Sequence, residues 1–416
     1  MPYHIDPITT PWRALAMEKP VILPISERAQ RVKPSATLAV TARAAELRAA
    51  GKDVIGLGAG EPDFDTPEHI KQAAIDAIQR GFTKYTAVDG IGELKSAIQA
   101  KFERDNQLNY EANQILVSVG AKQTIFNLCQ ALLGNGDEVV IPAPYWVSYP
   151  DIALLSDATP VSVFAGVDQG FKITPEQLDA ALSPKTRLFM LNSPSNPTGA
   201  AYSRAELQAL GEVLARYEQV VIATDDMYEH IYWSDEPFCS LVTACPDLYD
   251  RTVTINGVSK CYAMTGWRIG YCGGPASLVG TMKKIQGQST SNPVSISQVA
   301  AVAALDGDQS CVAEMTKAFK QRHDYVVKAL NEIPGFSCRP GEGTFYAFPD
   351  VSGAIAATDG VNNDLELAEY LINEVGVALV PGSAFGAPNY LRLSFAYSLD
   401  TLQSAIGRLA TAFGGN

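Results

Sequence analysis

Short apolar runs rich in β-branched residues alternate with segments of helical periodicity from about residue 115 onward. The run QILVSVG leads into AKQTIFNLCQALL, in which Ala121, Ile125, Leu128 and Leu132 share one helical face. Further runs follow at DEVVIPAP, TPVSVFAG, TRLFMLNSP, QVVIATDD, RTVTINGVS and WRIGYCGG. Apolar strands fed by helices indicate a mostly parallel sheet that is covered on both faces. We therefore predict an α/β fold.

The C-terminal part of the chain has a different pattern. After about residue 308 a long charged helical segment reaches about 331, and it precedes GTFYAFPD, a helical segment near 364–374, GVALVPG, YLRLSFA and a last helix. This order predicts a smaller α+β domain. A chain of 416 residues also exceeds what one core usually fills. We expect an arm at 1–25 with little structure of its own, a small domain formed by 26–65 and 308–416, and a large domain at 66–307.

Charge and hydropathy exclude several classes of partner. The formal net charge of -13 argues against nucleic acid or an anionic membrane surface. The first residues have no charged stretch followed by a long apolar run, and no later run reaches the roughly 18 apolar residues of a membrane span. The seven cysteines lack a CxxC pair or a metal-ligand spacing, as is usual in a reducing compartment. We expect a cytoplasmic protein without a metal site.

Lys260 has neighbours that are unusual for a surface lysine. It follows the strand-like run VTINGVS, and WRIGY comes shortly after it, so apolar segments flank it on both sides. Most lysines after a strand are solvated. Here Ser259, Arg268 and the apolar flanks favour a partly dry setting, where an amine is more easily held neutral and nucleophilic.

Schiff-base chemistry with pyridoxal phosphate would explain such a lysine. It requires a carboxylate for the pyridine nitrogen, a group for the ring oxygen, a flat residue against the ring and a phosphate site. The turn ATDDMYEH offers Asp225 and Tyr228, NSPSNPTG offers Asn196, and PAPYWVSYP offers Trp146. Each of these stretches also has an ordinary structural interpretation, as an acidic turn, a Pro/Asn/Gly turn or a packed aromatic residue.

The phosphate site is predicted at SVGAKQT, where a strand gives way to a helix. Gly120, Ala121 and Lys122 lie at that junction. The first N–H groups of a helix have no partner within it, and they bind phosphate well. A glycine turn before a helix is common, so this signal is weak alone.

Taken together, these stretches resemble a known family. GAGEPDFDTPEHI, TKYTAVDGIGELK, NSPSNPTGA, TDDMYEH, NGVSKCYAMTGWRIGY and YLRLSFA occur in this order and cover about residue 26 to the C-terminus. The chain resembles fold-type I pyridoxal-phosphate enzymes, and specifically the class I aminotransferases of the aspartate aminotransferase family, subgroup Ib. It departs from the family pattern in having TDD where SDE is usual, and in its longer N-terminal arm.

The resemblance implies a role for each cofactor-binding residue. The implied set is Lys260 for the Schiff base, Asp225 for the pyridine nitrogen, Tyr228 and Asn196 for the phenolic oxygen, Trp146 for ring stacking, and Ser259, Arg268 and the amides of Ala121 and Lys122 for the phosphate. Tyr85 of TKYT corresponds to a tyrosine that reaches the phosphate of the neighbouring subunit's cofactor. The family therefore implies a homodimer with shared active sites.

Substrate residues are implied in the same way. Arg392 of YLRLSFA corresponds to the arginine that binds the α-carboxylate, and a planar guanidinium suits that task. The backbone of Gly60 and the side chains of Trp146 and Asn196 border the same position. For a second carboxylate, GQSTSNP (287–293) contains no arginine, and the subgroup instead uses Lys122 with residues of KPSAT such as Ser35 and Thr37. Dicarboxylates are thus the expected substrates.

These roles predict an enzyme that moves the amino group of L-aspartate to 2-oxoglutarate. Lys33 of KPSAT resembles a residue linked to prephenate use, so prephenate or aromatic substrates stay open. The alternatives on the same scaffold are a broad-specificity or aromatic aminotransferase and a C–S β-lyase. A non-catalytic regulator is disfavoured, because the N-terminal arm has neither the helices nor the positive charge of a DNA-binding module.

Overall fold

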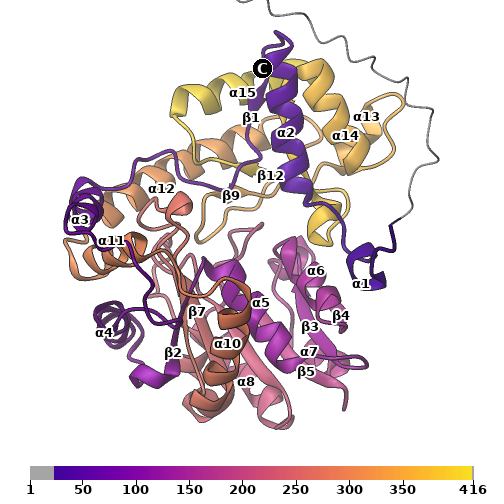
Figure 1. The fold of residues 1–416 in the computed structure, drawn as a ribbon. Helices are drawn as coiled ribbons and strands as arrows, with labels where there is room; N and C mark the ends of the chain where they lie inside the picture. Colours follow the sequence, from indigo (N-terminus) through magenta and orange to yellow (C-terminus); the bar gives the residue numbers. More distant parts are fainter. Residues whose placement is uncertain (1–22, 415–416) are drawn as a thin grey trace, which may run out of the picture.

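The computed structural model describes residues 23–414 (Figure 1). The predicted arm at 1–25 thus lies almost entirely outside the described residues. Within them, the largest sheet has seven strands in the order β2-β8-β7-β6-β5-β3-β4, and all run parallel except β8. The strands are β2 (Ile115–Ser118), β3 (Glu138–Ala143), β4 (Thr159–Phe164), β5 (Thr186–Asn192), β6 (Val221–Asp225), β7 (Thr252–Gly257) and β8 (Gly270–Gly273). The predicted α/β class with a mostly parallel sheet is confirmed.

Helices cover both faces of this sheet. The residues of β2, β7 and β8 are all buried, which explains why these runs are apolar without alternation. One face packs against α5 (Ala121–Leu132), α6 (Ser148–Leu155) and α10 (Ala276–Ser289). The other packs against α3 (Glu68–Gln79), α4 (Gly92–Lys101), α7 (Pro175–Ala181), α8 (Arg204–Ala215), α9 (Leu241–Ala244) and α11 (Ser295–Asp306).

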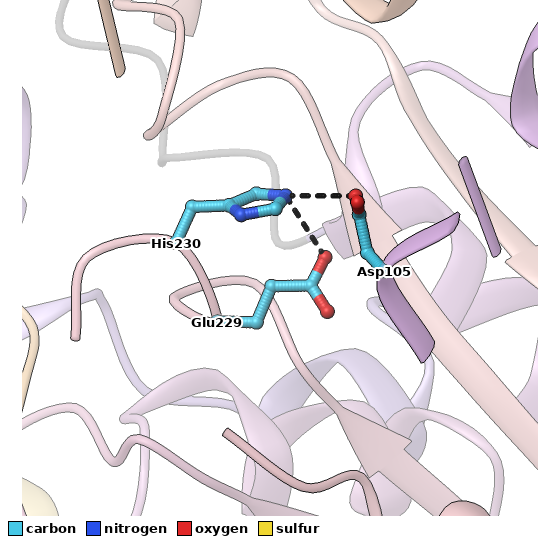
Figure 2. A group of neighbouring side chains, drawn as sticks. All are labelled: Asp105, Glu229 and His230. Carbon is cyan, nitrogen blue, oxygen red and sulfur yellow. Dashed lines mark ion pairs between the residues drawn. The ribbon is translucent and has the colours of Figure 1, made fainter. Parts of the chain in front are cut away.

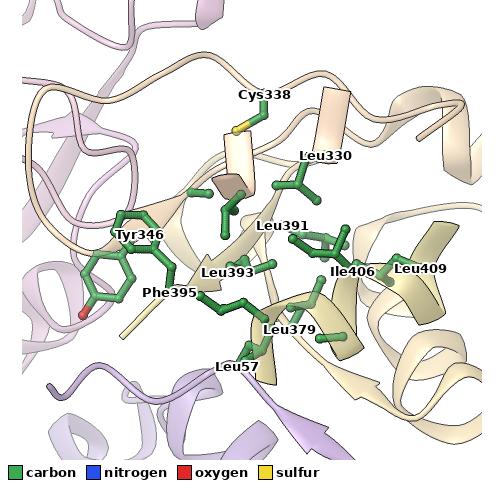
Figure 3. Close-up of a cluster of buried hydrophobic side chains, with 14 of the residues drawn as sticks. Leu57, Leu330, Cys338, Tyr346, Leu379, Leu391, Leu393, Phe395, Ile406 and Leu409 are labelled. Carbon is green, nitrogen blue, oxygen red and sulfur yellow. The ribbon is translucent and has the colours of Figure 1, made fainter. Parts of the chain in front are cut away.

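A second core joins the two ends of the chain. It contains a parallel pair, β1 (Ile55–Gly56) with β10 (Val377–Ala378), and an antiparallel sheet of β9 (Tyr346–Ala347), β11 (Val380–Pro381) and β12 (Leu391–Ser394). Figure 3 shows Leu57 packed with Leu379, Leu391 and Leu393 from the C-terminal part. The surrounding helices are α2 (Ala36–Ala49), α12 (Ser310–Asn331), α13 (Ser352–Ala357), α14 (Asp364–Tyr370) and α15 (Leu399–Ala412).

We propose that this second core defines the small domain, with the boundaries 26–65 and 308–416 expected from the sequence. In Figure 1, α2 (purple) lies beside the yellow C-terminal helices, although more than 300 residues separate them. The remaining short segments are α1 (Glu27–Gln30), η1 (Phe102–Asn106), η2 (Ala112–Gln114), η3 (Val167–Gln169), η4 (Pro246–Arg251), η5 (Thr265–Trp267), η6 (Leu371–Val375) and η7 (Gly382–Phe385).

The sheet topology brings distant polar residues to one edge. β5, β6 and β7 are adjacent and parallel, so their carboxyl ends, at Asn192, Asp225 and Gly257, point the same way. The loops that follow therefore meet at this edge, which is where open parallel sheets bind ligands. In residues 23–414, no helix is both long and apolar enough to cross a bilayer.

Candidate active site

A cavity of about 410 Å³ lies at the carboxyl edge of the sheet. Residues from both cores line it, so the site is formed only where the two come together. Thirteen of the fifteen residues predicted from the sequence line this cavity: Ser35, Thr37, Gly60, Ala121, Lys122, Trp146, Asn196, Asp225, Tyr228, Ser259, Lys260, Arg268 and Arg392. The two others, Lys33 and Tyr85, do not line it.

The Lys260 amine has little to hold it as a cation. Its Nζ donates a hydrogen bond to the Gly60 carbonyl oxygen at 2.5 Å, and no carboxylate of the described residues lies at ion-pair distance. Burial, followed by the nearby Arg392 guanidinium, lowers the pKa of Lys260 to about 8. An amine with this pKa is available in its neutral form close to physiological pH.

Asp225 is a buried carboxylate at the last position of β6. Tyr149 Oη donates a hydrogen bond to its Oδ2 at 2.6 Å, and the Met227 N–H donates to its Oδ1 at 3.3 Å. Burial raises the pKa of Asp225 to about 6, while these two hydrogen bonds and Lys260 oppose the rise. Asp225 is therefore mostly ionised at neutral pH.

Arg392 is a buried cation without an anion. It is 2% exposed, and its guanidinium lies 4.4 Å from the centre of the Tyr346 ring and 5.0 Å from that of Phe385. It donates to Asn196 Oδ1 at 2.9 Å and to the Gly58 carbonyl oxygen at 2.7 Å. Its Nε has no partner among the described residues. An unpaired buried charge is costly, so this arrangement favours an anionic ligand.

Tyr228 and Asn196 are polar, uncharged residues that line the same cavity. Tyr228 Oη lies 3.1 Å from Tyr346 Oη, and Asn196 is held by its backbone N–H, which donates to Asn192 Oδ1 at 2.8 Å. Both residues are buried. Two neutral groups that can donate hydrogen bonds thus face the cavity beside the cationic end of the site.

An anion-binding corner lies at the start of α5. Ala121 and Lys122 begin this helix, so their N–H groups have no partner in the preceding turn. Arg268 packs against Gly120, whose φ is +80°, and a Cβ at position 120 would overlap the Arg268 guanidinium. Glycine is required there for both reasons. Ser259 completes the lining on this side.

Lys122 and Trp146 are in direct contact. The Lys122 Nζ lies 4.9 Å from the centre of the Trp146 ring, and no carboxylate among residues 23–414 forms an ion pair with it. Burial, and then the nearby Arg268, lower the pKa of Lys122. The Lys122 amine lies in the same cavity as Arg392, so the cavity contains two cationic groups suited to carboxylates.

Two predicted residues lie outside the cavity. Tyr85 is 91% exposed in the single chain. The backbone of Lys33 donates a hydrogen bond to Asp151, whose pKa burial raises while this bond and the Lys33 charge oppose the rise. Ser35, two residues later, is the N-cap of α2 and does reach the cavity.

Tyr149 and Tyr346 are site residues that sequence reasoning missed. Tyr149 is three residues after Trp146, in the first turn of α6, and its backbone N–H donates to the Trp146 carbonyl oxygen at 3.0 Å, so this short spacing could have revealed it. Tyr346 comes from β9 of the second core, and its contacts with Tyr228 and Arg392 join segments more than 40 residues apart. No local signal marks it.

A second charged cluster lies away from this cavity. Figure 2 shows the His230 Nε2 within 3.3 Å of carboxylate oxygens of both Asp105 and Glu229. The Lys101 ammonium forms an ion pair with Glu229 in the same cluster, so a cation already occupies the position that a metal would take. A wider cavity of about 840 Å³ opens beside Asp105 and His230.

The 410 Å³ cavity fits pyridoxal phosphate. A lysine amine, a carboxylate for a ring nitrogen, a flat aromatic side chain and an anion-binding corner all line it, and none of its cations forms an ion pair with a carboxylate of residues 23–414. These are the groups that the coenzyme requires of a protein.

Comparisons with known proteins agree with this chemistry. The sequence model of the family described as aminotransferase class I and II matches residues 52–409. An aspartate/prephenate aminotransferase of Nitrosomonas europaea is 57% identical over 93% of this chain and 99% of its own length. A protein of the same name from Cereibacter sphaeroides is 56% identical over 92% of this chain and 97% of its own.

Solved structures give the same result. The aspartate aminotransferase of Rhizobium meliloti is 49% identical, with a TM-score of 0.91 over 94% of this chain and 99% of that one. The aspartate aminotransferase of Thermus thermophilus with maleate is 40% identical, with a TM-score of 0.88 over 94% and 100% of the two chains. Enzymes of this kind use pyridoxal 5'-phosphate. With the fold, the cavity and these matches, the chain belongs to the class I and II aminotransferases, in the aspartate aminotransferase family.

Proposed function

We propose that this protein is an aspartate aminotransferase that moves the amino group of L-aspartate to 2-oxoglutarate, forming oxaloacetate and L-glutamate. The observation that carries the proposal is Arg392, a buried guanidinium in the cavity that contains Lys260 and Asp225, with no anionic partner among the residues that the structure describes. A substrate carboxylate would supply the missing anion. The small molecules bound here are therefore amino acids and 2-oxo acids.

Asp225 and the anion-binding corner would hold the coenzyme. Pyridoxal phosphate, when bound, supplies an electron-accepting ring and an aldehyde that exchanges with the substrate amino group. The ionised Asp225 carboxylate would hold a proton on the ring nitrogen, and Tyr228 and Asn196 would donate hydrogen bonds to the ring oxygen. Trp146 packs on the ring. The α5 amides of Ala121 and Lys122, with Ser259 and Arg268, bind the phosphate.

Lys260 moves the proton in this proposal. Its amine is neutral for a substantial fraction of molecules near pH 7 to 8, because its pKa is about 8. It can therefore take up the proton of the substrate α-carbon as a base and give a proton back as an acid. The Gly60 carbonyl, which accepts its hydrogen bond, keeps the amine inside the cavity.

Two cations would bind the two carboxylates of a dicarboxylate substrate. Arg392 binds the α-carboxylate through both guanidinium nitrogens, which Asn196 and Gly58 hold in position. Lys122 turns from the Trp146 ring to the distal carboxylate, with Ser35 and Thr37 lining that side. Thr37 Oγ1 is buried without a partner among the described residues, so it is available for a substrate oxygen. The relative with maleate, itself a dicarboxylate, supports this choice of substrate class.

Prephenate is a second candidate acceptor. The Nitrosomonas europaea and Cereibacter sphaeroides relatives are both named aspartate/prephenate aminotransferases, and both exceed 50% identity. Lys33, next to the cavity-lining segment at Ser35, is the residue that we assign to this activity. Prephenate carries two carboxylates, as the two cations require.

We further propose a cytoplasmic homodimer with shared sites. Tyr85 is 91% exposed, and Phe82 and Val294 are exposed apolar residues at 38% and 52%. Ser295 Oγ donates to the Phe82 carbonyl oxygen at 2.9 Å, so Phe82 and Val294 lie close together, and contiguous exposed apolar residues mark an interface. A second copy would cover them and bring its Tyr85 to the phosphate corner. The seven free cysteines suit a reducing compartment.

Substitution of Arg392 by lysine tests whether its guanidinium binds the substrate carboxylate. In Arg392→Lys one charge remains, but the paired hydrogen bonds are lost, so KM for aspartate should rise about 100-fold with a smaller change in kcat. A KM within twofold of the parent would contradict the assignment.

The proposed homodimer has its own test. Sedimentation of the purified protein measures whether it is a dimer.

A panel of donors with 2-oxoglutarate and oxaloacetate as acceptors separates the activities. Nitrogen recovered in the product amino acid is expected, whereas release of ammonia and pyruvate would indicate a β-lyase. Prephenate is included as an acceptor with aspartate or glutamate as donor. Absence of conversion would remove the prephenate assignment and leave the aspartate assignment intact.

A further inference from the structure

Tyr149 makes the shortest hydrogen bond to the carboxylate beneath the cavity. It lies on α6, is 1% exposed, and donates from Oη to Asp225 Oδ2 at 2.6 Å. Its ring packs edge-on against Trp146, with 5.4 Å between the ring centres. Tyr149 itself does not line the cavity, so it acts from behind Asp225.

Asp225 has few other groups that favour its charge. In the described part of the chain no cation lies at ion-pair distance from it, and the second donor, the Met227 N–H, is at 3.3 Å. The titratable groups that face it are Tyr149, Tyr228, Lys260 and, through Tyr149, Asp226. Lys260 favours the ionised form, whereas burial disfavours it. The ionisation of Asp225 thus depends strongly on the Tyr149 phenol.

The phenol is well suited to this task. Burial and the neighbouring Asp225 charge raise the pKa of Tyr149 well above its usual value, so Tyr149 remains a donor throughout the working pH range. A donor that is always protonated stabilises the carboxylate form over the neutral acid. The bond also fixes the rotation of the carboxyl group, because Oδ2 is engaged on the side away from the cavity lining.

We propose that Tyr149 is a positioning residue that keeps Asp225 ionised and oriented for the ring nitrogen of the coenzyme. The inference rests on the proposed function only in that Asp225 must contact a pyridine ring. It adds a residue whose effect is transmitted through Asp225 and is pH-dependent. The substrate specificity of the enzyme does not enter.

The test measures coenzyme affinity instead of turnover. Apoenzyme of Tyr149→Phe is titrated with pyridoxal 5'-phosphate at about pH 6 and about pH 8.5, and absorbance gives the dissociation constant. Loss of the hydrogen bond should raise the pKa of Asp225 by about one unit, so at the lower pH affinity should fall by about 5- to 10-fold more than at the higher pH. An equal loss at both pH values would overturn the inference.

Two further variants act as controls. Tyr110→Phe removes another buried hydroxyl, which is 2.9 Å from Thr254 Oγ1 and makes no hydrogen bond to Asp225 in the described residues, and it should leave the pH dependence unchanged. Tyr149→His retains a donor and should recover most of the affinity at low pH. A histidine variant that behaves like the phenylalanine variant would count against the proposal.

The same variants distinguish a folding defect from a change in coenzyme binding. Thermal unfolding of each apoenzyme reports stability. If both Tyr149 variants fail to fold while Tyr110→Phe folds, Tyr149 is a core residue and the proposal is wrong. If aspartate proves not to be the substrate while the pH-dependent loss of affinity persists, the proposed function fails and this inference stands.

Discussion

Lys101 is buried and Lys260 is partly buried, and the two lysines differ in what surrounds them. Lys101 is 1% exposed, forms an ion pair with Glu229 and donates to Asn106 Oδ1 at 2.7 Å. Lys260 has a single carbonyl acceptor, at Gly60, and faces the Arg392 guanidinium. The first lysine is held as a cation by its neighbours. The second is destabilised as a cation, which frees its lone pair for chemistry.

The partners of Lys101 extend this contrast. Glu229 also accepts from Asn256 Nδ2 at 2.8 Å and from Asn106 Nδ2 at 2.7 Å, so both charges are saturated with hydrogen bonds. Glu229 directly follows Tyr228, and Asn256 is on the strand that leads to Lys260. The Lys101–Glu229 ion pair thus stabilises the segments that carry Tyr228 and Lys260. The two lysines therefore differ most in their partners.

Removing Lys260 should have the largest effect on catalysis. Lys260→Ala should bind pyridoxal phosphate without a covalent bond and should lower kcat by about 10⁴-fold or more, because the amine that transfers the proton is removed. Stopped-flow and steady-state rates measure this. Since the variant removes a poorly paired cation, its Tm should not fall. Appreciable turnover would refute the lysine assignment.

Removing Lys101 should instead affect stability. Lys101→Met leaves Glu229 charged and buried without its ion pair, so the free energy of unfolding should fall by about 3 to 5 kcal/mol. Urea denaturation measures this. The double variant Lys101→Met with Glu229→Gln removes both charges and should recover a large part of the loss. A double variant as unstable as the single one would show that packing, not charge, explains the effect.

The pH dependence of coenzyme capture sharpens the contrast further. A lysine must be neutral to attack an aldehyde, and the pKa of Lys260 is about 8. The rate at which apoenzyme captures pyridoxal phosphate should therefore rise about 10-fold per pH unit up to about pH 8 and then level off. Arg392→Met removes a neighbouring cation and should move the plateau to higher pH. A plateau near pH 10 in the parent protein would contradict a depressed pKa.

Lys122 is an intermediate case and should give the smallest effect. It rests on the Trp146 ring without a carboxylate partner, but it is closer to solvent than Lys260. Lys122→Ala should lower kcat/KM for aspartate about 10-fold more than for alanine or an aromatic amino acid, which have no distal carboxylate. Equal losses for all donors would mean that Lys122 does not bind that group.

Local sequence patterns predicted much of this molecule. The parallel strands were visible as apolar runs, and because strand ends share one edge, the residues after them could be expected to meet. Contacts between remote segments were not visible in the same way. The sequence around Lys101 is typical of an exposed charge at the end of a helix. In the structure Lys101 is buried, because it pairs with Glu229, more than 120 residues later. Tyr149 and Asp225 are likewise joined only by the assembled sheet.

The position of Arg392 in the chain has a consequence for protein synthesis. A nascent polypeptide that has left the ribosome up to residue 307 already contains Lys260, Asp225 and the start of α5, whereas β12 has not yet been translated. Domains generally fold as they emerge. Such an intermediate has the groups that capture the vitamin B6 coenzyme but lacks the guanidinium that anchors an amino acid. Coenzyme loading can thus precede substrate recognition during biogenesis.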